Sequence, residues 1–464
     1  MRARPSLWFV MNGTRELLRR ARIRSYAESM NVRFAASLCL ALMGCSSEKP
    51  TEPKIDEPTG LPARIYALDG ISTTLEHDDL TPFRQMVGNT PVVALGESTH
   101  ASLGFYQAKY RLIRYMVEEM GFRIVTFETP WLAALPATQF VESCEGGAHN
   151  AMRGFHQVWR DATVRSMLQW MCDYNKAHPN DKVKFYGMDI QEPWNSVPAL
   201  DAFVSRSAPG QIARVDPLRR CLGGSARNDS FFVSTEYRDL VEGRRNFAAH
   251  DECLSGITDM ESWISGNQSA LQAATSATEV EEARLSLVAI KAMEDQLWIP
   301  DPGGYQGRDH GMAELTRRLH QLHAPGKKMI VWAWNWHIAR RYEEVRGFND
   351  DPEFVIPRQG ARAMGGFLTD AYGASYMPIG LIGYQVGQAF GTQPPVQTNL
   401  LAIERRLNDL GKPYLLVDLR QPLPDTIAVP GRTYRVSQEW ADPYRQYDGL
   451  IFLRLSNAAT LLPP

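Results

Sequence analysis

Short apolar runs that end on a charged residue recur along this chain, and amphipathic segments separate them. The first run, residues 92–95, is Val-Val-Ala-Leu and leads into Gly-Glu-Ser-Thr-His. Apolar side chains then recur at helical spacing up to Met120, and Gly121-Phe122 opens a second apolar run that ends on Glu128. This order predicts a strand–helix–strand unit, and such units pair their strands in parallel and side by side.

The same alternation continues towards the C-terminus. Further strands are predicted at residues 183–190, 328–334, 379–386, 414–419 and 449–455, and helices at 151–177, 308–323, 358–364 and 400–410. Residues 235–298 are rich in Ala, Glu, Leu and Met, which predicts a helical insertion at about 235–300. We therefore expect an α/β fold, in which helices flank a central, mostly parallel sheet and the insertion covers the carboxyl ends of the strands.

Polar residues follow four of the predicted strands. Glu97 and His100 follow the first strand, Glu128 and Asp189 end the next two, and His337 comes just after the fourth. The carboxyl ends of parallel strands meet at one edge of a sheet, where α/β proteins bind their ligands. A neighbouring carboxylate fixes the tautomer of an imidazole and raises its basicity, as activation of a hydrolytic water requires. We therefore expect Glu97, His100, Glu128 and His337 to be catalytic residues.

Four further residues are expected to bind the substrate or its oxyanion. Lys109 and Arg308 are cations of the kind that stabilises the oxyanion of ester hydrolysis. Asp189 and Trp334 are placed to line the same cleft. Each of these residues also has a simpler structural interpretation: the two cations as solvated helix residues, Asp189 as a helix cap, and Trp334 as part of the core.

Two other chemistries are less well supported by the motifs. Ser98 follows a strand, but a nucleophile elbow needs Gly-x-Ser-x-Gly, and His100 takes the place of its last glycine. Glu97, His100, Glu128 and His337 could together ligate zinc or manganese, but no His-Glu-x-x-His helix is present in the sequence. We therefore expect neither a metal nor an organic cofactor.

Residues 1–44 are predicted to be a targeting segment whose true start could be Met30. Arg33 precedes an apolar run of ten residues, too short to span a bilayer, and Gly44-Cys45 follows it. This pattern resembles a bacterial lipobox, which implies that Cys45 carries a lipid anchor in the bacterial cell envelope, at the outer membrane or in the periplasm.

A tether and one large domain are expected after this segment. Residues 45–64 are rich in Ser, Glu, Lys and Pro and predict a flexible tether, which leaves residues 65–464 for the α/β domain. Residues 1–44 carry eight Arg and two Glu, so their removal changes the net charge from −2 to about −8. This negative charge argues against nucleic acid as a partner.

Four cysteines remain in the predicted domain, an even number that favours disulfides in an oxidising compartment. Three pairings are open, and the most local one joins Cys144 to Cys172 and Cys221 to Cys253.

Several of these motifs resemble the erythromycin esterase family. The family begins with Gly-Glu-Ala-Thr-His-Gly, a helix, and a Gly-Phe turn into a strand that ends in Glu. Residues 96–101 read Gly-Glu-Ser-Thr-His-Ala, and Gly121-Phe122 and Glu128 follow. Later segments resemble family patterns in the same order up to the C-terminus; they are residues 186–191, 308–313, 364–368 and 447–452.

The resemblance also implies roles for individual residues. His100 matches the family's proposed general base, and Glu97 and Glu128 match the acids beside it. His337 matches the second histidine of a Trp-Ala-His-Asn-x-His segment, and Lys109 stands where relatives carry a cation, often Arg.

Two departures from the family pattern matter for the expected site. Trp334 replaces the first histidine of the late segment, and Gly104 replaces a Glu.

The function implied by the resemblance is hydrolysis of an ester or lactone of a small molecule, with macrolide antibiotics among the substrates to test. Two alternatives stay open: a surface lipoprotein that binds a ligand such as haem, and a metal-dependent hydrolase that uses the same residues.

Overall fold

The computed structural model describes residues 60–191, 193–224, 247–323, 326–389 and 393–463. The predicted targeting segment, Cys45, nearly all of the tether and residues 235–246 of the insertion lie outside the described residues. None of the described helices is long and apolar enough to cross a membrane.

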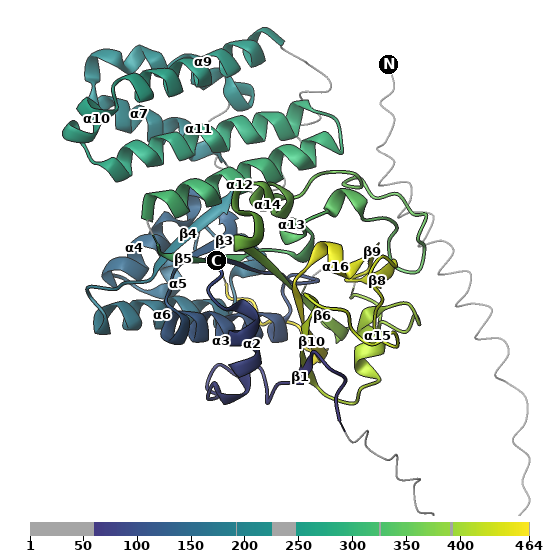
Figure 1. The fold of residues 1–464 in the computed structure, drawn as a ribbon. Coiled ribbons are helices and arrows are strands. Elements are labelled where there is room, and N and C mark those ends of the chain that lie inside the picture. Colours follow the sequence, from purple (N-terminus) through teal and green to yellow (C-terminus); the bar gives the residue numbers. More distant parts are fainter. Residues whose placement is uncertain (1–59, 192, 225–246, 324–325, 390–392, 464) are drawn as a thin grey trace, which may run out of the picture. The chain divides into compact units, whose positions relative to one another are not determined.

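An eight-stranded sheet runs through the domain in the order β1-β7-β10-β6-β2-β5-β3-β4 (Figure 1). Its strands are β1 (Ile65–Ala67), β2 (Val92–Leu95), β3 (Phe122–Pro130), β4 (Lys184–Asp189), β5 (Lys328–Trp332), β6 (Tyr376–Val386), β7 (Tyr414–Asp418) and β10 (Gly449–Ser456). The six strands from β10 to β4 pair in parallel, whereas β7 and β1 pair antiparallel at one edge. The expected α/β fold with a mostly parallel sheet is confirmed.

The order of the central strands differs from the prediction. We expected β2 and β3 to be neighbours, but β5 lies between them and pairs with both. The two strands of a strand–helix–strand crossover can be separated by another strand. Here β5 lies in that position, and its residues Met329 to Trp332 are apolar and buried. As a result, Leu95, Trp332 and Phe127 lie at one level of the sheet, and the residues that follow them meet at its carboxyl edge.

Helices cover both faces of the sheet because alternate strand residues point to opposite sides. Val93 and Leu95 pack against one helical layer, and Val92 and Ala94 face the other. The first layer consists of α2 (Thr81–Val87), α3 (Leu103–Met120), α4 (Leu135–Ser143), α5 (Ala148–Ala151) and α6 (Ala162–Ala177). The second includes α12 (Gly303–His323), α13 (Asn335–Ile338), α14 (Met364–Tyr372) and α15 (Ile403–Asn408).

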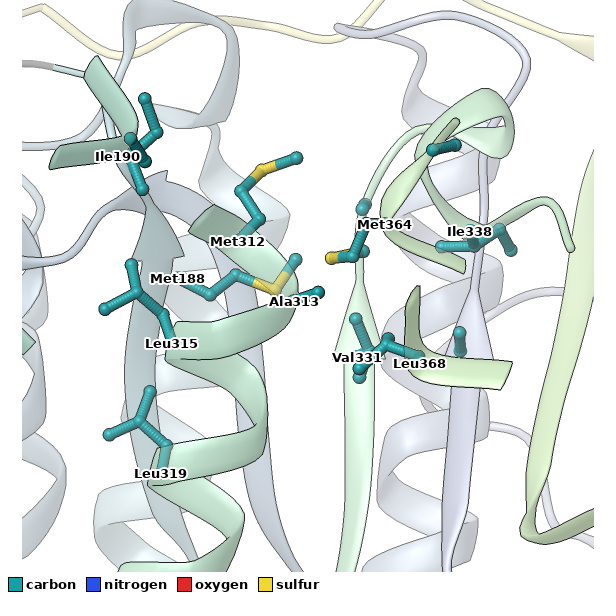
Figure 2. Close-up of a cluster of buried hydrophobic side chains, with 14 of the residues drawn as sticks. Met188, Ile190, Met312, Ala313, Leu315, Leu319, Val331, Ile338, Met364 and Leu368 are labelled. Atoms are coloured by element: carbon teal, nitrogen blue, oxygen red, sulfur yellow. The ribbon is translucent and has the colours of Figure 1, made fainter. Parts of the chain in front are cut away.

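Helix α12 lies against the strands that end at the site (Figure 2). Met312 and Leu315 of α12 share a buried cluster with Met188 of β4, and Met364 of α14 shares it with Val331 of β5. Burial of each such side chain stabilises the fold by about 1.5–3 kcal/mol. This packing fixes α12, and with it the residues of the preceding turn.

The helical insertion forms an outer layer on α12 (Figure 1). The described helices of this layer are α9 (Phe247–Gly266), α10 (Gln268–Ala274) and α11 (Ala277–Trp298), together with α7 (Ser196–Ser207), which lies before the range predicted for the insertion and packs against α11. A disulfide joins Cys221 to Cys253 within it, and a second joins Cys144 at the end of α4 to Cys172 of α6. Of the three pairings that the sequence left open, the structure has the most local one.

Two predicted helices have different boundaries. The helix expected at 358–364 begins only at Met364, where the side chain of Asp309 accepts its first N–H. The helix expected at 151–177 is interrupted, and α6 begins at Ala162 because the side chain of Asp161 accepts the Thr163 N–H at its N-cap.

Minor elements complete the domain. They are the hairpin β8 (Tyr434–Val436) and β9 (Glu439–Ala441), the short helix α16 (Pro443–Gln446), and several 3-10 turns that include η3 (Gln157–Trp159) and η6 (Pro217–Gly224).

Gly104, one of the two departures from the family pattern, is required by close packing. A Cβ there would lie 2.7 Å from Ser456 Oγ and 2.8 Å from Leu453 Cδ2, both on β10. We expect Gly104→Ala to lower the free energy of unfolding by about 1–3 kcal/mol, because overpacking outweighs the gain in helix propensity.

Urea unfolding would measure this effect, with Gly266→Ala as the matched control. Gly266 ends α9 and is exposed, and a Cβ added there would meet nothing within 4 Å, so its substitution should change stability by about 0.5 kcal/mol or less. A Gly104→Ala protein as stable as the wild type would contradict the packing argument.

Candidate active site

The turn after β2 carries Glu97 and His100, and the backbone holds it closely. The Gly96 N–H donates to Ile379 O of β6 at 2.9 Å, and Glu97 O accepts the Asn335 N–H at 2.9 Å. A Cβ on Gly96 would lie 2.0 Å from Asn335 Oδ1, so only glycine allows this approach. Asn335 in turn bonds Leu381 through both its side-chain atoms. The turn is thus fixed to the ends of both strands that flank β2.

Glu97 joins an imidazole to a buried cation. One carboxylate oxygen lies 2.6 Å from His100 Nδ1 and the other lies 2.9 Å from Lys109 Nζ. Glu97 and Lys109 have no exposed side-chain surface, and the ammonium also bonds Ala333 O and lies 4.4 Å from the centre of the Trp332 ring. Burial lowers the pKa of Lys109 to about 8 although Glu97 opposes the change.

His100 is the member of this group that solvent reaches, with 23% of its side chain exposed. Its ring lies 4.7 Å from Trp159, edge to face, and 4.8 Å from Trp334, centre to centre. Two aromatic rings therefore border the imidazole, and Trp334 stands beside His100 at the position of the family's first histidine.

Glu128, at the end of β3, is the centre of a second polar group. Its carboxylate accepts the Trp334 N–H at 2.8 Å and lies 3.3 Å from a nitrogen of Arg308 and 3.2 Å from His337 Nε2. Burial alone would raise the pKa of Glu128, but His337, His100 and Arg308 lower it to about 2. Glu128 is therefore ionised at neutral pH.

Arg308 binds Asp189 in a two-pronged ion pair, with N–O distances of 3.1 and 2.7 Å. Burial would raise the pKa of Asp189, but Arg308 and His156 hold it well below its usual range. Burial would also lower the pKa of Arg308, but Asp189 and Glu128 raise it instead. Both groups stay charged, and Arg308 is 9% exposed.

His337 lies beside this ion pair, with its Nε2 3.2 Å from Arg308 Nη1, and its side chain has no exposed surface. Its Nδ1 is 2.8 Å from Asp309 Oδ1, which also accepts the Met364 N–H at 2.7 Å. Burial lowers the pKa of His337, but Asp309 and Glu128 raise it more, so the net shift favours the imidazolium. This histidine neutralises carboxylates.

The structure brings together all eight residues expected in the cleft, although not in equivalent positions. Lys109 lies beneath Glu97 with no surface for a substrate oxyanion. The first N–H groups of α3 are also occupied, because those of Leu103 and Gly104 donate to Asn457 O and Ser456 Oγ. Arg308 is the cation that retains access to solvent.

Sequence reasoning missed two members of the site. Asp309 directly follows Arg308, so its position next to an expected site residue was a signal in the sequence. His156 Nε2 lies 3.8 Å from Asp189 Oδ2, on the loop that interrupts the predicted helix, and no spacing in the sequence links these two residues.

The geometry does not match the metal-ligand set considered for this cleft. Within the described ranges, three donors of His, Cys, Asp or Glu lie within 4.8 Å of one another only at Cys221, Cys253 and Glu294. Those two cysteines form a disulfide and supply no thiolate.

Solved structures with the same fold are known at low sequence identity. A Bacillus cereus protein shares 20% identity with a TM-score of 0.70, over 86% of this chain and 97% of its own. The erythromycin esterase variant EreC, in its open conformation, shares 17% identity with a TM-score of 0.65, over 86% of this chain and all of its own. These similarities support the fold.

Curated relatives are similar over different lengths. Erythromycin esterase type II of Escherichia coli is 29% identical over 114 residues, 25% of this chain and 27% of its own length. The putative hydrolase YbfO of Bacillus subtilis is 21% identical over 68% of this chain and 69% of its own. Erythromycin esterase type I of Escherichia coli is 21% identical over 57% of this chain and 66% of its own.

A family model described as erythromycin esterase matches residues 117–456, most of the domain and three of the four strand ends that carry the candidate site. With the fold and the order of the motifs in agreement, the chain belongs to the erythromycin esterase family, which indicates a hydrolase.

Proposed function

We propose that this protein hydrolyses an ester or lactone of a small molecule, with His100 as the general base. The observation that carries the proposal is the pairing of His100 with Glu97. The carboxylate binds Nδ1 at 2.6 Å, and this imidazole is partly exposed whereas that of His337 is fully buried. Glu97 holds the proton on Nδ1, so the lone pair of Nε2 is available to a water molecule.

The reaction then follows from this arrangement. Nε2 of His100 takes a proton from water, and the water oxygen attacks the carbonyl carbon. The resulting oxyanion lies near Arg308, whose charge stabilises it. Collapse of the tetrahedral intermediate breaks the bond to the leaving oxygen, which takes the proton from the imidazolium. An ester gives an acid and an alcohol, and a lactone gives one hydroxy acid.

The two alternatives are less favoured. A metal-dependent reaction would need several donors around one ion, and Glu97, His100, Glu128 and His337 do not gather in that way. Membership of a hydrolase family favours catalysis over the binding of a ligand such as haem.

His100→Ala should lower kcat/KM by about 10²–10⁴-fold, because the general base is lost. Turnover of a panel of simple esters, lactones and 14-membered macrolides by the purified protein would measure this effect.

His178→Ala is the matched control, since His178 is exposed at the C-terminal end of α6. It should keep the wild-type rate. Full activity in His100→Ala on a substrate that the wild type hydrolyses would exclude His100 as the base.

Activity should also fall as the pH rises through about 8. Lys109 has a pKa of about 8, so its proton is lost there and Glu97 loses its counter-charge. In Lys109→Arg the fall should disappear, because a guanidinium stays protonated throughout this range.

The pH dependence of kcat/KM would test this prediction, and Lys291→Arg, on the exposed face of α11, is the control. The same fall near pH 8 in Lys109→Arg would show that a group other than the Lys109 ammonium causes it.

We further propose that a lipid on Cys45 anchors the enzyme in the cell envelope. The lipobox-like sequence supports this location, as do the two disulfides, which are typical of an oxidising compartment. Cys45→Ala should move the protein from the membrane fraction to the soluble fraction.

Cell fractionation with Cys39→Ala as the control would measure this change. Cys39 lies in the segment expected to be removed, so its substitution should leave the protein with the membranes. Retention of Cys45→Ala in the membrane fraction would overturn the anchor.

A further inference from the structure

The residue after His100 has a strained backbone. Ala101 is fully buried and has φ = +53°, in the left-handed region that side-chain-bearing residues rarely adopt. Such strain persists only where neighbouring groups hold it, and it is common at functional sites. The conformation of Ala101 sets the direction in which the chain leaves His100, and therefore where the imidazole stands.

Hydrogen bonds hold Ala101 on both sides. Its carbonyl accepts N–H groups from Ala389 at 3.1 Å and Ala459 at 2.9 Å. Its N–H donates to the hydroxyl of Tyr106 at 2.6 Å, and that hydroxyl donates to Val158 O at 2.7 Å. The Tyr106 hydroxyl thus accepts one hydrogen bond and donates another, and it stays protonated because burial raises its pKa well above 10.

We propose that Tyr106 is a positioning residue for His100: its hydroxyl holds Ala101 in the left-handed conformation and links this turn to the loop that carries Trp159. The inference rests on the proposed role of His100. Tyr106 touches no reacting atom, and it acts through the backbone on one side of the imidazole and through Val158, next to Trp159, on the other.

The position of Tyr106 on α3 supports this role. Tyr106 and Lys109 are three residues apart and lie on the same face of the helix. Lys109 binds Glu97 at the beginning of the turn, and Tyr106 binds Ala101 at its end. The ring of Tyr106 also lies 5.7 Å from Trp159, whose own ring contacts His100. One helical face therefore supports both ends of the segment from Glu97 to Ala101.

The test compares Tyr106→Phe with Tyr110→Phe. Both changes remove one hydroxyl from α3 and keep the ring, but the Tyr110 hydroxyl donates to Ser166 O of α6 at 3.3 Å, away from the turn. Tyr106→Phe should lower kcat about tenfold, the kinetic equivalent of one hydrogen bond, with KM within about twofold of the wild type. Tyr110→Phe should keep the wild-type kcat.

Ala101→Gly in the Tyr106→Phe background separates positioning from general loss of stability. Glycine adopts the left-handed region without a steric penalty, so the double variant should recover most of the lost kcat. A loss of similar size in both Tyr→Phe variants, or a loss that Ala101→Gly leaves unchanged, would overturn the proposal.

A spectroscopic measurement keeps the test independent of turnover. The proton between His100 Nδ1 and Glu97 should give a downfield ¹H NMR signal, assigned by its absence in His100→Ala. Tyr106→Phe should shift or broaden this signal, and Tyr110→Phe should not. If the wild type hydrolyses no ester or lactone, the proposed reaction is wrong, but this signal still tests the role of Tyr106. An unchanged signal in Tyr106→Phe would overturn that role.

Discussion

The buried carboxylate of Glu97 is the group on which the site depends. A buried carboxylate is stable only when cations and hydrogen-bond donors surround it, and Glu97 has Lys109 on one oxygen and His100 on the other. Removal of one partner from such a buried pair costs about 3–5 kcal/mol. The interactions that compensate the burial of Glu97 are therefore the same ones that hold the imidazole in place. Stability and the orientation of His100 are inseparable here, which explains why the backbone of the turn, Asn335 and α3 all converge on this short segment.

The second polar group complements the first. Glu128, Asp189 and Asp309 are neutralised by Arg308 and by a fully buried His337. These charges come from two strand ends, from the chain after β5 and from α12, so they hold α12 against the carboxyl edge of the sheet. Met312 and Leu315, further along α12, pack in the buried cluster (Figure 2), and this packing fixes the helix that carries Arg308. A fixed guanidinium needs little rearrangement when charge develops on a substrate.

The sequence was most informative where local patterns determine structure. Apolar runs predicted the strands. The polar residues after these runs predicted the candidate site, because all parallel strands end at the same edge of the sheet. The order of the strands was wrong, since nothing local in residues 328–332 shows that β5 enters between β2 and β3. The separation of roles among the cations also required the structure. Lys109 and Arg308 both lie on helices, and only the structure shows that the ammonium is fully buried beside Glu97 whereas the guanidinium is 9% exposed. The contact between His156 and Asp189 could not be predicted, because His156 lies in a loop where helical periodicity predicted a continuous helix.

The difference in solvent access between the two histidines determines which of them can turn over protons. An imidazole that serves as a base must return its proton in every cycle, which requires contact with the leaving group or with water. His100 is partly exposed between the rings of Trp159 and Trp334, whereas His337 is enclosed by Asp309, Glu128 and Arg308. The environment of His337 favours its imidazolium, so His337 retains its proton, whereas the proposed reaction requires His100 to exchange one. Trp334 strengthens this division, because an apolar ring beside His100 excludes a competing proton acceptor from the position where a second histidine would stand.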